Sequence, residues 1–175
     1  RTPMNGVLGM IELLQGTRLD ETQRLYVSTV QNSGKTLLTV INDILDIDKI
    51  SAGEMRLNLR PEKLAPLIEQ AVKVNMAYAV KFSVALESSP VDPELVISVD
   101  ADRLQQVLSN LLSNAIKYNK KYGSIDLKVL QKENNIVRVC IMDTGLGISE
   151  ELLQEIFQPF NRLNAAYSIE GTGIG

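Results

Sequence analysis

The hydrophobic spacing of this chain changes abruptly at residues 51–53, and no single regular element can span that change. Before it, apolar side chains recur at alternating intervals of three and four residues, the spacing of a helix that packs along a coiled-coil seam. The seam positions are Val30, Gly34, Leu37, Ile41, Ile44 and Asp48, broadened by Leu38 and Leu45. After Gly53, apolar and polar residues alternate, which is the period of a strand. The sequence therefore predicts two domains, residues 1–53 and 54–175.

The first domain is predicted to be a helical hairpin. Its first helix ends at Gly16, and Asp20 is a suitable N-cap for a second helix that runs towards Gly53. At about 34 residues the second helix would be roughly 50 Å long, about twice the length of the first. Its surplus apolar seam must pack against a second copy, further sequence or the next domain. A two-fold four-helix bundle is the simplest closed arrangement.

The second domain mixes strands and helices. We expect strands at 55–60, 84–86, 95–99, 125–129 and 137–141, a helix that Pro61 opens, and a helix at 104–118 that Asp100 caps. The last two strands flank an evident hairpin turn at 133–135, and we expect adjacent strands to pair antiparallel. The fold class predicted for the whole chain is α+β, with a helical hairpin followed by a sandwich of helices on one face of a sheet.

The helix at 104–118 carries two different faces. At about 100° per residue, Leu104, Leu108, Leu111 and Ala115 form one apolar stripe, which Leu112 and Ile116 widen. Asn110, Asn114, Lys117 and Tyr118 recur on a separate stripe. Amide oxygens can ligate a hard cation, while an ammonium and amide nitrogens can meet phosphate oxygens. The polar stripe thus suits an anionic ligand, although taken alone it also fits a solvated helix face.

Composition excludes several classes of function. The net charge is −3 and the sequence pI is near 5.1, which argues against nucleic acid and an anionic membrane surface as partners. The one cysteine, Cys140, permits no internal disulfide and is expected to be a buried, reduced thiol, which favours a cytoplasmic location. No apolar run approaches the ~20 residues of a membrane span, and no signal peptide opens the chain, so we expect membrane attachment only through other parts of a parent protein. The sequence has no histidine, which excludes a Ser-His-Asp triad within it.

Glycine motifs follow the predicted hairpin. The run Asp143-Thr144-Gly145-Leu146-Gly147-Ile148 places an acid at the end of a buried strand, where a carboxylate can accept a hydrogen bond from an exocyclic amine and glycines permit close backbone approach. Such a run alone is often a simple turn. Further on, Phe157 and Arg162 bound an aromatic segment, and glycines at 171, 173 and 175 suit a phosphate-binding loop before a helix.

In order and spacing, these motifs resemble the N, G1, F and G2 boxes of the ATP-binding domain of sensor histidine kinases, a Bergerat-fold domain shared with gyrase and heat-shock chaperone ATPases. The boxes are residues 110–118, 143–148, 157–162 and 171–175. The hairpin, which begins Arg1-Thr2-Pro3, is similar to the dimerisation and phosphoacceptor domain of the same family. The parent protein could be a hybrid sensor kinase.

The resemblance implies a role for each matching residue. Asn114 would ligate Mg²⁺ at the ATP phosphates, and Asn110 would sit beside it and help to position the acceptor imidazole, so both would act in catalysis. Lys117 would pair with phosphate, and Tyr118 would pack near the ribose or adenine. Asp143 would bind the adenine amino group, and Gly145, Gly147 and Ile148 would lie against the base. Phe157 would belong to the ATP site, although it also fits an ordinary core aromatic. Arg162 and the loop to Thr172 would form a mobile lid, with Gly171, Gly173 and Gly175 at the phosphates. Thr2 would orient water when a partner regulator is dephosphorylated.

The implied activity is autophosphorylation of a histidine with ATP and Mg²⁺, followed by transfer to an aspartate in the receiver domain of a response regulator. The implied assembly is a homodimer. The family's acceptor histidine would lie three residues before Arg1, and the chain stops inside the G2 box, so we expect no autophosphorylation by these residues alone. The alternative is a pseudokinase, a dimerisation scaffold that binds nucleotide and signals by conformation without phosphotransfer.

Overall fold

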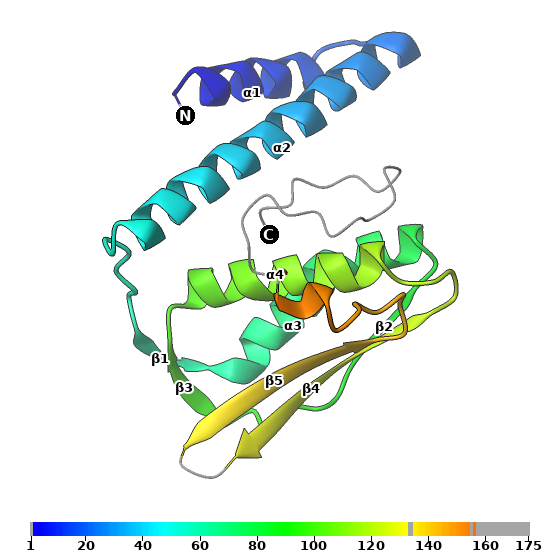
Figure 1. Ribbon diagram of the computed structural model, residues 1–175. Coiled ribbons are helices and arrows are strands. Elements are labelled where there is room, and N and C mark those ends of the chain that lie inside the picture. The colour runs from blue at the N-terminus through cyan, green and yellow to red at the C-terminus, as the bar shows by residue number, and fades with distance from the viewer. Residues whose placement is uncertain (1, 133–134, 155, 157–175) are drawn as a thin grey trace. The chain divides into compact units, whose positions relative to one another are not determined.

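The computed structural model describes residues 2–132, 135–154 and 156. They form two compact units, one ending at Met55 and the other beginning at Arg56 (Figure 1). The first is helical and the second combines helices with strands, so the α+β class predicted from the sequence is confirmed. None of the helices in the described part of the chain combines the length and apolarity needed to cross a bilayer.

The first unit is a hairpin of α1 (Thr2–Gln15) and α2 (Glu21–Ser51). Asp20 caps α2 as predicted: its carboxylate accepts the backbone N–H of Gln23 at 2.8 Å, and the Gln23 side chain accepts the N–H of Asp20 at 3.0 Å. This reciprocal pair satisfies N–H groups that the first helical turn leaves without partners. The start of α2 is thereby fixed by local sequence.

Much of the apolar seam of α2 is not covered within one chain. α2 has 31 residues and α1 has 14, so α2 extends well past its partner (Figure 1). Gly34 is buried, and Leu8 of α1 packs directly over it. Other seam residues keep more than a third of their surface exposed, namely Val30, Leu37, Ile44 and Leu45. The hairpin therefore presents an apolar surface that its own two helices do not bury.

Strands of the second unit form two small sheets. β1 (Arg60–Lys63) pairs antiparallel with β3 (Val96–Val99). In the other sheet β4 (Ser124–Lys132) lies between β2 (Ala85–Ser88) and β5 (Ile136–Asp143). β4 and β5 form the predicted antiparallel hairpin, although residues 133–134 of its turn lie outside the described part.

Two expectations about the strands were wrong. β2 and β4 run parallel, because β3 and an intervening helix form a crossover long enough to return the chain in the same direction. The first strand begins at Arg60 and contains Pro61, which was expected to open a helix. Pro61 is tolerated because β1 is an edge strand, where the missing N–H leaves no ladder partner unpaired. The alternating Leu57 and Leu59 precede the strand and are exposed.

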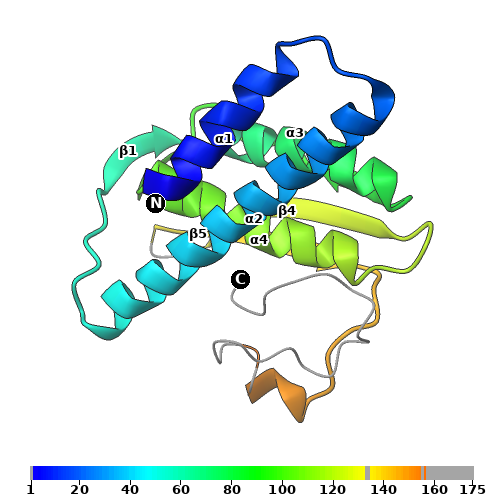
Figure 2. The same ribbon diagram turned by 90° about the horizontal axis from the view of Figure 1, so that it is seen from above.

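Two helices cover one face of the three-stranded sheet, α3 (Leu64–Lys81) and α4 (Ala101–Lys117) (Figure 2). The core lies between the helices and the sheet, and its largest fully buried side chains are Leu64, Ile68, Leu108, Leu112, Ile116, Ile125 and Leu127. The side chain of Gln105 on α4 donates to the backbone carbonyl of Leu67 on α3 at 2.6 Å. α4 is thus held by packing and by a hydrogen bond to its neighbour.

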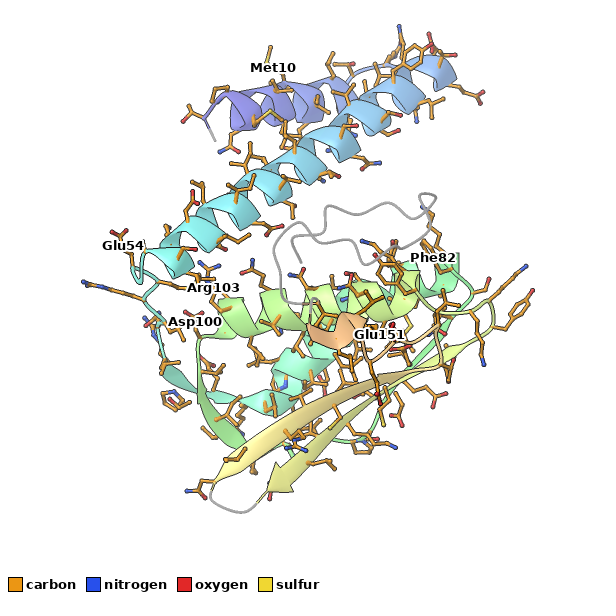
Figure 3. All side chains as sticks on the ribbon, viewed as in Figure 1. Met10, Glu54, Phe82, Asp100, Arg103 and Glu151 are labelled. Carbon is orange, nitrogen blue, oxygen red and sulfur yellow. The ribbon has the colours of Figure 1, made fainter. Side chains whose placement is uncertain are left out.

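Asp100 fixes the start of α4, where Figure 3 labels it next to Arg103. Its carboxylate accepts the backbone N–H of Arg103 at 3.2 Å, as expected of an N-cap, and also that of Asn58 at 2.9 Å. These N–H groups, with Asn58 first, favour the charged form and hold the pKa of Asp100 below its ordinary value of 3.8. One carboxylate therefore joins the segment before β1 to the first turn of α4.

We expect the stability of the second unit to depend on Asp100 in acid. Because the folded pKa is lowered, the stabilisation is complete above 3.8 and is lost as the pH falls through the folded value. Asp100→Asn should therefore flatten the loss of stability as the pH falls below 3.8. Urea unfolding across this range tests it. Asp102→Asn, two residues further on, should keep the steep acid limb, and an equally steep limb in Asp100→Asn would contradict the assignment.

Candidate functional site

α4 buries one face and turns the other outward, as its sequence predicts. Leu108, Leu112 and Ile116 are among the most buried side chains of the chain. Leu111 was expected on the buried stripe, but 51% of its surface is exposed. At 100° per residue it lies about 60° round the helix from Leu108, towards Asn114, which places it at the edge of the stripe.

The outward face carries the four polar residues singled out in the sequence. Asn110, Asn114, Lys117 and Tyr118 are all half-buried. Lys117 is the last residue of α4. Tyr118 is the C-cap of the helix, and its backbone N–H donates to the carbonyl of Asn114 at 3.0 Å. A half-buried row of two carboxamides and an ammonium is accessible to a ligand and held in place by the helix.

The loop after β5 docks on the C-terminal end of α4. The backbone N–H of Leu146 donates to the carbonyl of Tyr118 at 3.2 Å. That carbonyl belongs to the last turn of the helix, whose C=O groups have no helical partners. The two segments with the strongest chemical signal in the sequence, the polar face of α4 and the glycine motif, therefore meet at one end of the unit.

Asp143 ends β5 and shapes this loop. Its Oδ1 accepts the backbone N–H of Gly145 at 2.8 Å, an Asx-type turn. Its Oδ2 has no hydrogen-bond partner among the described residues. Asp143 is exposed and Cys140 is half-buried, so the expectation of a buried strand and a buried thiol was wrong. β5 is an edge strand of the described sheet, and the helices cover only one face of it.

Gly145 is required by the docking of the loop. A Cβ built at this position would lie 2.5 Å from the Tyr118 carbonyl oxygen and 2.7 Å from Asp143 Oδ1. Gly147 has φ of 71°, a left-handed conformation that most side chains disfavour, but open space surrounds it. Leu146 is 82% exposed and Ile148 is also exposed, so the loop presents apolar side chains to its surroundings.

Two polar residues of this region, Thr144 and Asn119, were not predicted as site residues from the sequence. Thr144 lies inside the glycine motif, and its hydroxyl donates to Oδ1 of Asn119, the residue after Tyr118, at 3.1 Å. In the sequence, these two residues are marked only by their position directly after Tyr118 and Asp143, which were predicted to bind the nucleotide.

The other residues predicted for the site are not found near α4 and the Asp143 loop in the described part of the chain. Six lie outside the described residues: Phe157, Arg162, Gly171, Thr172, Gly173 and Gly175. Thr2 is an exposed residue of α1 and belongs to the first unit. A groove of about 640 Å³ lies between β3 and the far end of the β4–β5 hairpin, but none of the residues predicted to bind nucleotide lines it.

The donor set defines what kind of cation could bind. Within residues 2–132, 135–154 and 156 no group of three or more acids or thiols could hold a metal ion. Mg²⁺ at nucleotide sites commonly takes one or two protein ligands and completes its shell with phosphate oxygens and water. A carboxamide oxygen from Asn114, with phosphate supplying the rest, fits that pattern.

The chain matches two protein families in succession. Residues 1–53 match the His Kinase A (phospho-acceptor) domain, and residues 99–175 match the Histidine kinase-, DNA gyrase B-, and HSP90-like ATPase family. Hybrid signal transduction histidine kinase A of Dictyostelium discoideum is 36% identical over 187 residues, covering 100% of this chain and 9% of that protein. The chain spans between 9% and 34% of the length of the curated relatives it matches.

Solved structures give the same result. The chain is similar to full-length ShkA in complex with AMPPNP, with a TM-score of 0.77 and 31% identity over 99% of this chain and 36% of that one. It is also similar to the histidine kinase ThkA in complex with the response regulator protein TrrA, with a TM-score of 0.60 and 26% identity over 90% and 46% of the two chains.

The two loop glycines should respond differently to alanine. Gly145→Ala forces a methyl group against a backbone carbonyl, so we expect the larger loss, about 2–3 kcal/mol in unfolding free energy. Gly147→Ala adds left-handed strain without a clash and should cost about 1 kcal/mol. Urea unfolding of both variants measures the difference. Equal losses would show that the loop does not press on α4.

Proposed function

Because this chain belongs to the sensor histidine kinases, with a phospho-acceptor hairpin ahead of an ATPase unit, we propose that it acts in two-component signal transduction. The proposed reaction is ATP-dependent phosphorylation of a histidine on the dimerisation helix. The phosphoryl group then passes to an aspartate of a response regulator. The observation that carries this proposal is the docking of the Asp143 loop on the polar end of α4.

We propose that the adenine base binds at the Asp143 loop. One carboxylate oxygen of Asp143 is engaged by Gly145 N–H, while the other has no partner among the described residues and can accept the exocyclic amine. Gly147 and Ile148 continue the loop, and Tyr118 would pack near the base or ribose. The similarity to a kinase solved with AMPPNP supports an adenine nucleotide as the ligand.

The phosphates would extend along the outward face of α4. Asn114 would ligate Mg²⁺ with Asn110 beside it, and Lys117 would pair with a phosphate oxygen. The remaining predicted contacts, outside the described residues, are Phe157, Arg162, Gly171, Thr172, Gly173 and Gly175. When bound, Mg²⁺ would neutralise charge on the phosphates; the protein's own task is to hold the transferred group in line with its acceptor, since phosphoryl transfer depends mainly on positioning and electrostatics.

We propose that residues 1–53 form the dimerisation and phosphotransfer hairpin, that residues 54–175 form the catalytic ATP-binding domain, and that the protein is a cytoplasmic homodimer. The exposed seam of α2 is the surface that a second hairpin would cover. A receiver domain is the proposed partner, which the likeness to a kinase solved with its response regulator supports. Thr2 would assist dephosphorylation of that partner.

The pseudokinase alternative rests on one observation, that the 175 residues contain no histidine. It shares nucleotide binding and dimerisation with the kinase but predicts no transfer. Incubating the full-length protein with ATP and Mg²⁺ separates the two: acid-labile phosphate on a histidine supports the kinase, and its absence in a protein that binds ATP supports the scaffold.

Two substitutions test the assigned site in the full-length protein. Asn114→Asp should weaken Mg·ATP binding and autophosphorylation by about tenfold or more, because it changes a ligand beside the phosphates. Asp143→Asn should weaken the binding of ADP by a similar factor and leave the binding of GDP nearly unchanged, because Asp143 is proposed to bind the adenine base. Calorimetry and a phosphorylation assay provide the readouts. Asn32→Asp, at an exposed carboxamide of α2, is the charge-matched control for Asn114→Asp, and full activity of both site variants would disprove the site.

A further inference from the structure

One side chain ties together three segments around the Asp143 loop. The amide nitrogen of Asn119 donates to the carbonyl of Ser124 at 3.2 Å, and its Oδ1 accepts the backbone N–H of Lys120 at 3.0 Å. The same Oδ1 accepts the hydroxyl of Thr144 at 3.1 Å. These bonds link the turn after α4, the first residue of β4 and the loop that follows β5.

Thr144 receives further support from the same strand. Its Oγ1 accepts the backbone N–H of Ser124 at 2.9 Å, and its own N–H donates to the Ser124 carbonyl at 3.1 Å. Gly123 is buried directly beneath, and a Cβ there would collide with Asn119 Oδ1 and Thr144 Oγ1. The backbone before β4 is therefore shaped to let the two side chains meet.

The chemistry of the position calls for a carboxamide. It needs an acceptor for two donors, Thr144 O–H and Lys120 N–H, and a donor for the carbonyl of Ser124, all at the end of a short side chain. Asparagine offers both groups, whereas aspartate lacks the donor and alanine lacks both.

Thr144 is the residue between Asp143 and Gly145. A shift of the Thr144 backbone therefore moves both the Asp143 carboxylate and the Gly145 N–H. Apart from those of β5 itself, the hydrogen bonds that join this loop to the other described residues of the unit are the Leu146 bond to Tyr118 and the bonds of Thr144 with Ser124 and Asn119. Asn119 is the side chain among these that reaches from the end of α4.

We propose that Asn119 is a positioning residue for the nucleotide base. Acting through Thr144, it holds the Asp143–Gly145 segment at a fixed place relative to the polar face of α4, and so sets the affinity and selectivity for adenine without touching the ligand. The proposal rests on the proposed function, since it assumes that Asp143 binds the base.

The test measures dissociation constants of ADP and GDP for the full-length protein by calorimetry. Asn119→Ala should raise the dissociation constant of ADP about threefold to tenfold, which corresponds to the loss of one or two hydrogen bonds, and should change that of GDP little. Thr144→Val, which keeps the shape and removes the hydroxyl, should do the same. Thr144→Ser restores the hydroxyl and should retain the native ADP-to-GDP ratio. The double variant Asn119→Ala/Thr144→Val should be no worse than either single variant, because both break one link.

A matched control separates positioning from stability. Asn75 is a buried carboxamide of α3 whose side chain donates to the carbonyl of Ala71 at 2.9 Å. Asn75→Ala should lower the melting temperature but leave the ADP-to-GDP ratio unchanged. If Asp143→Asn loses adenine preference while Asn119→Ala and Thr144→Val keep it, this proposal is overturned and the proposed function stands. If the native protein binds no ADP, both are overturned.

Discussion

The backbone of the Asp143 loop approaches the last turn of α4 so closely that no side chain fits between them. A methyl group on Gly145 would lie 2.5 Å from the Tyr118 carbonyl oxygen, and the next residue, Leu146, donates its N–H to that same oxygen. Contact between main-chain atoms leaves little freedom, in contrast to contact between long side chains. The loop that carries the acid is therefore joined by main-chain contact to the helix that carries the carboxamides.

That arrangement depends on how firmly α4 itself is held. Its inner face supplies three of the most buried side chains of the core, and Gln105 ties it to α3. At its first turn, Asp100 bonds both to the helix and to Asn58, so the segment that follows the hairpin is attached directly to the helix that bears the site. A site built on a helix fixed at both ends can hold phosphate and base at a set separation.

Local sequence rules predicted much of this structure. The long helix α2, the Asp20 and Asp100 caps and the two faces of α4 each depend on residues a few positions apart, and the structure has all of them. The parallel pairing of β2 with β4 and the placement of Pro61 in an edge strand depend on segments distant in sequence, which periodicity does not encode. The hydrogen bond between Asn119 and Thr144 joins residues 25 positions apart, so periodicity does not predict it either. The sequence suggested that Gly145 lets the backbone approach a ligand. In the described structure, Gly145 lets the loop approach the last turn of α4.

We propose that one nucleotide bridges the carboxamide face of α4 and the loop after β5. Two-dimensional NMR of ¹⁵N-labelled protein, titrated with AMPPNP and Mg²⁺, measures both places in one experiment. If one nucleotide bridges the two places, the side-chain amide signal of Asn114 and the backbone amide signal of Gly145 will shift together and yield one dissociation constant. Shifts at only one of the two, or two different dissociation constants, would contradict it.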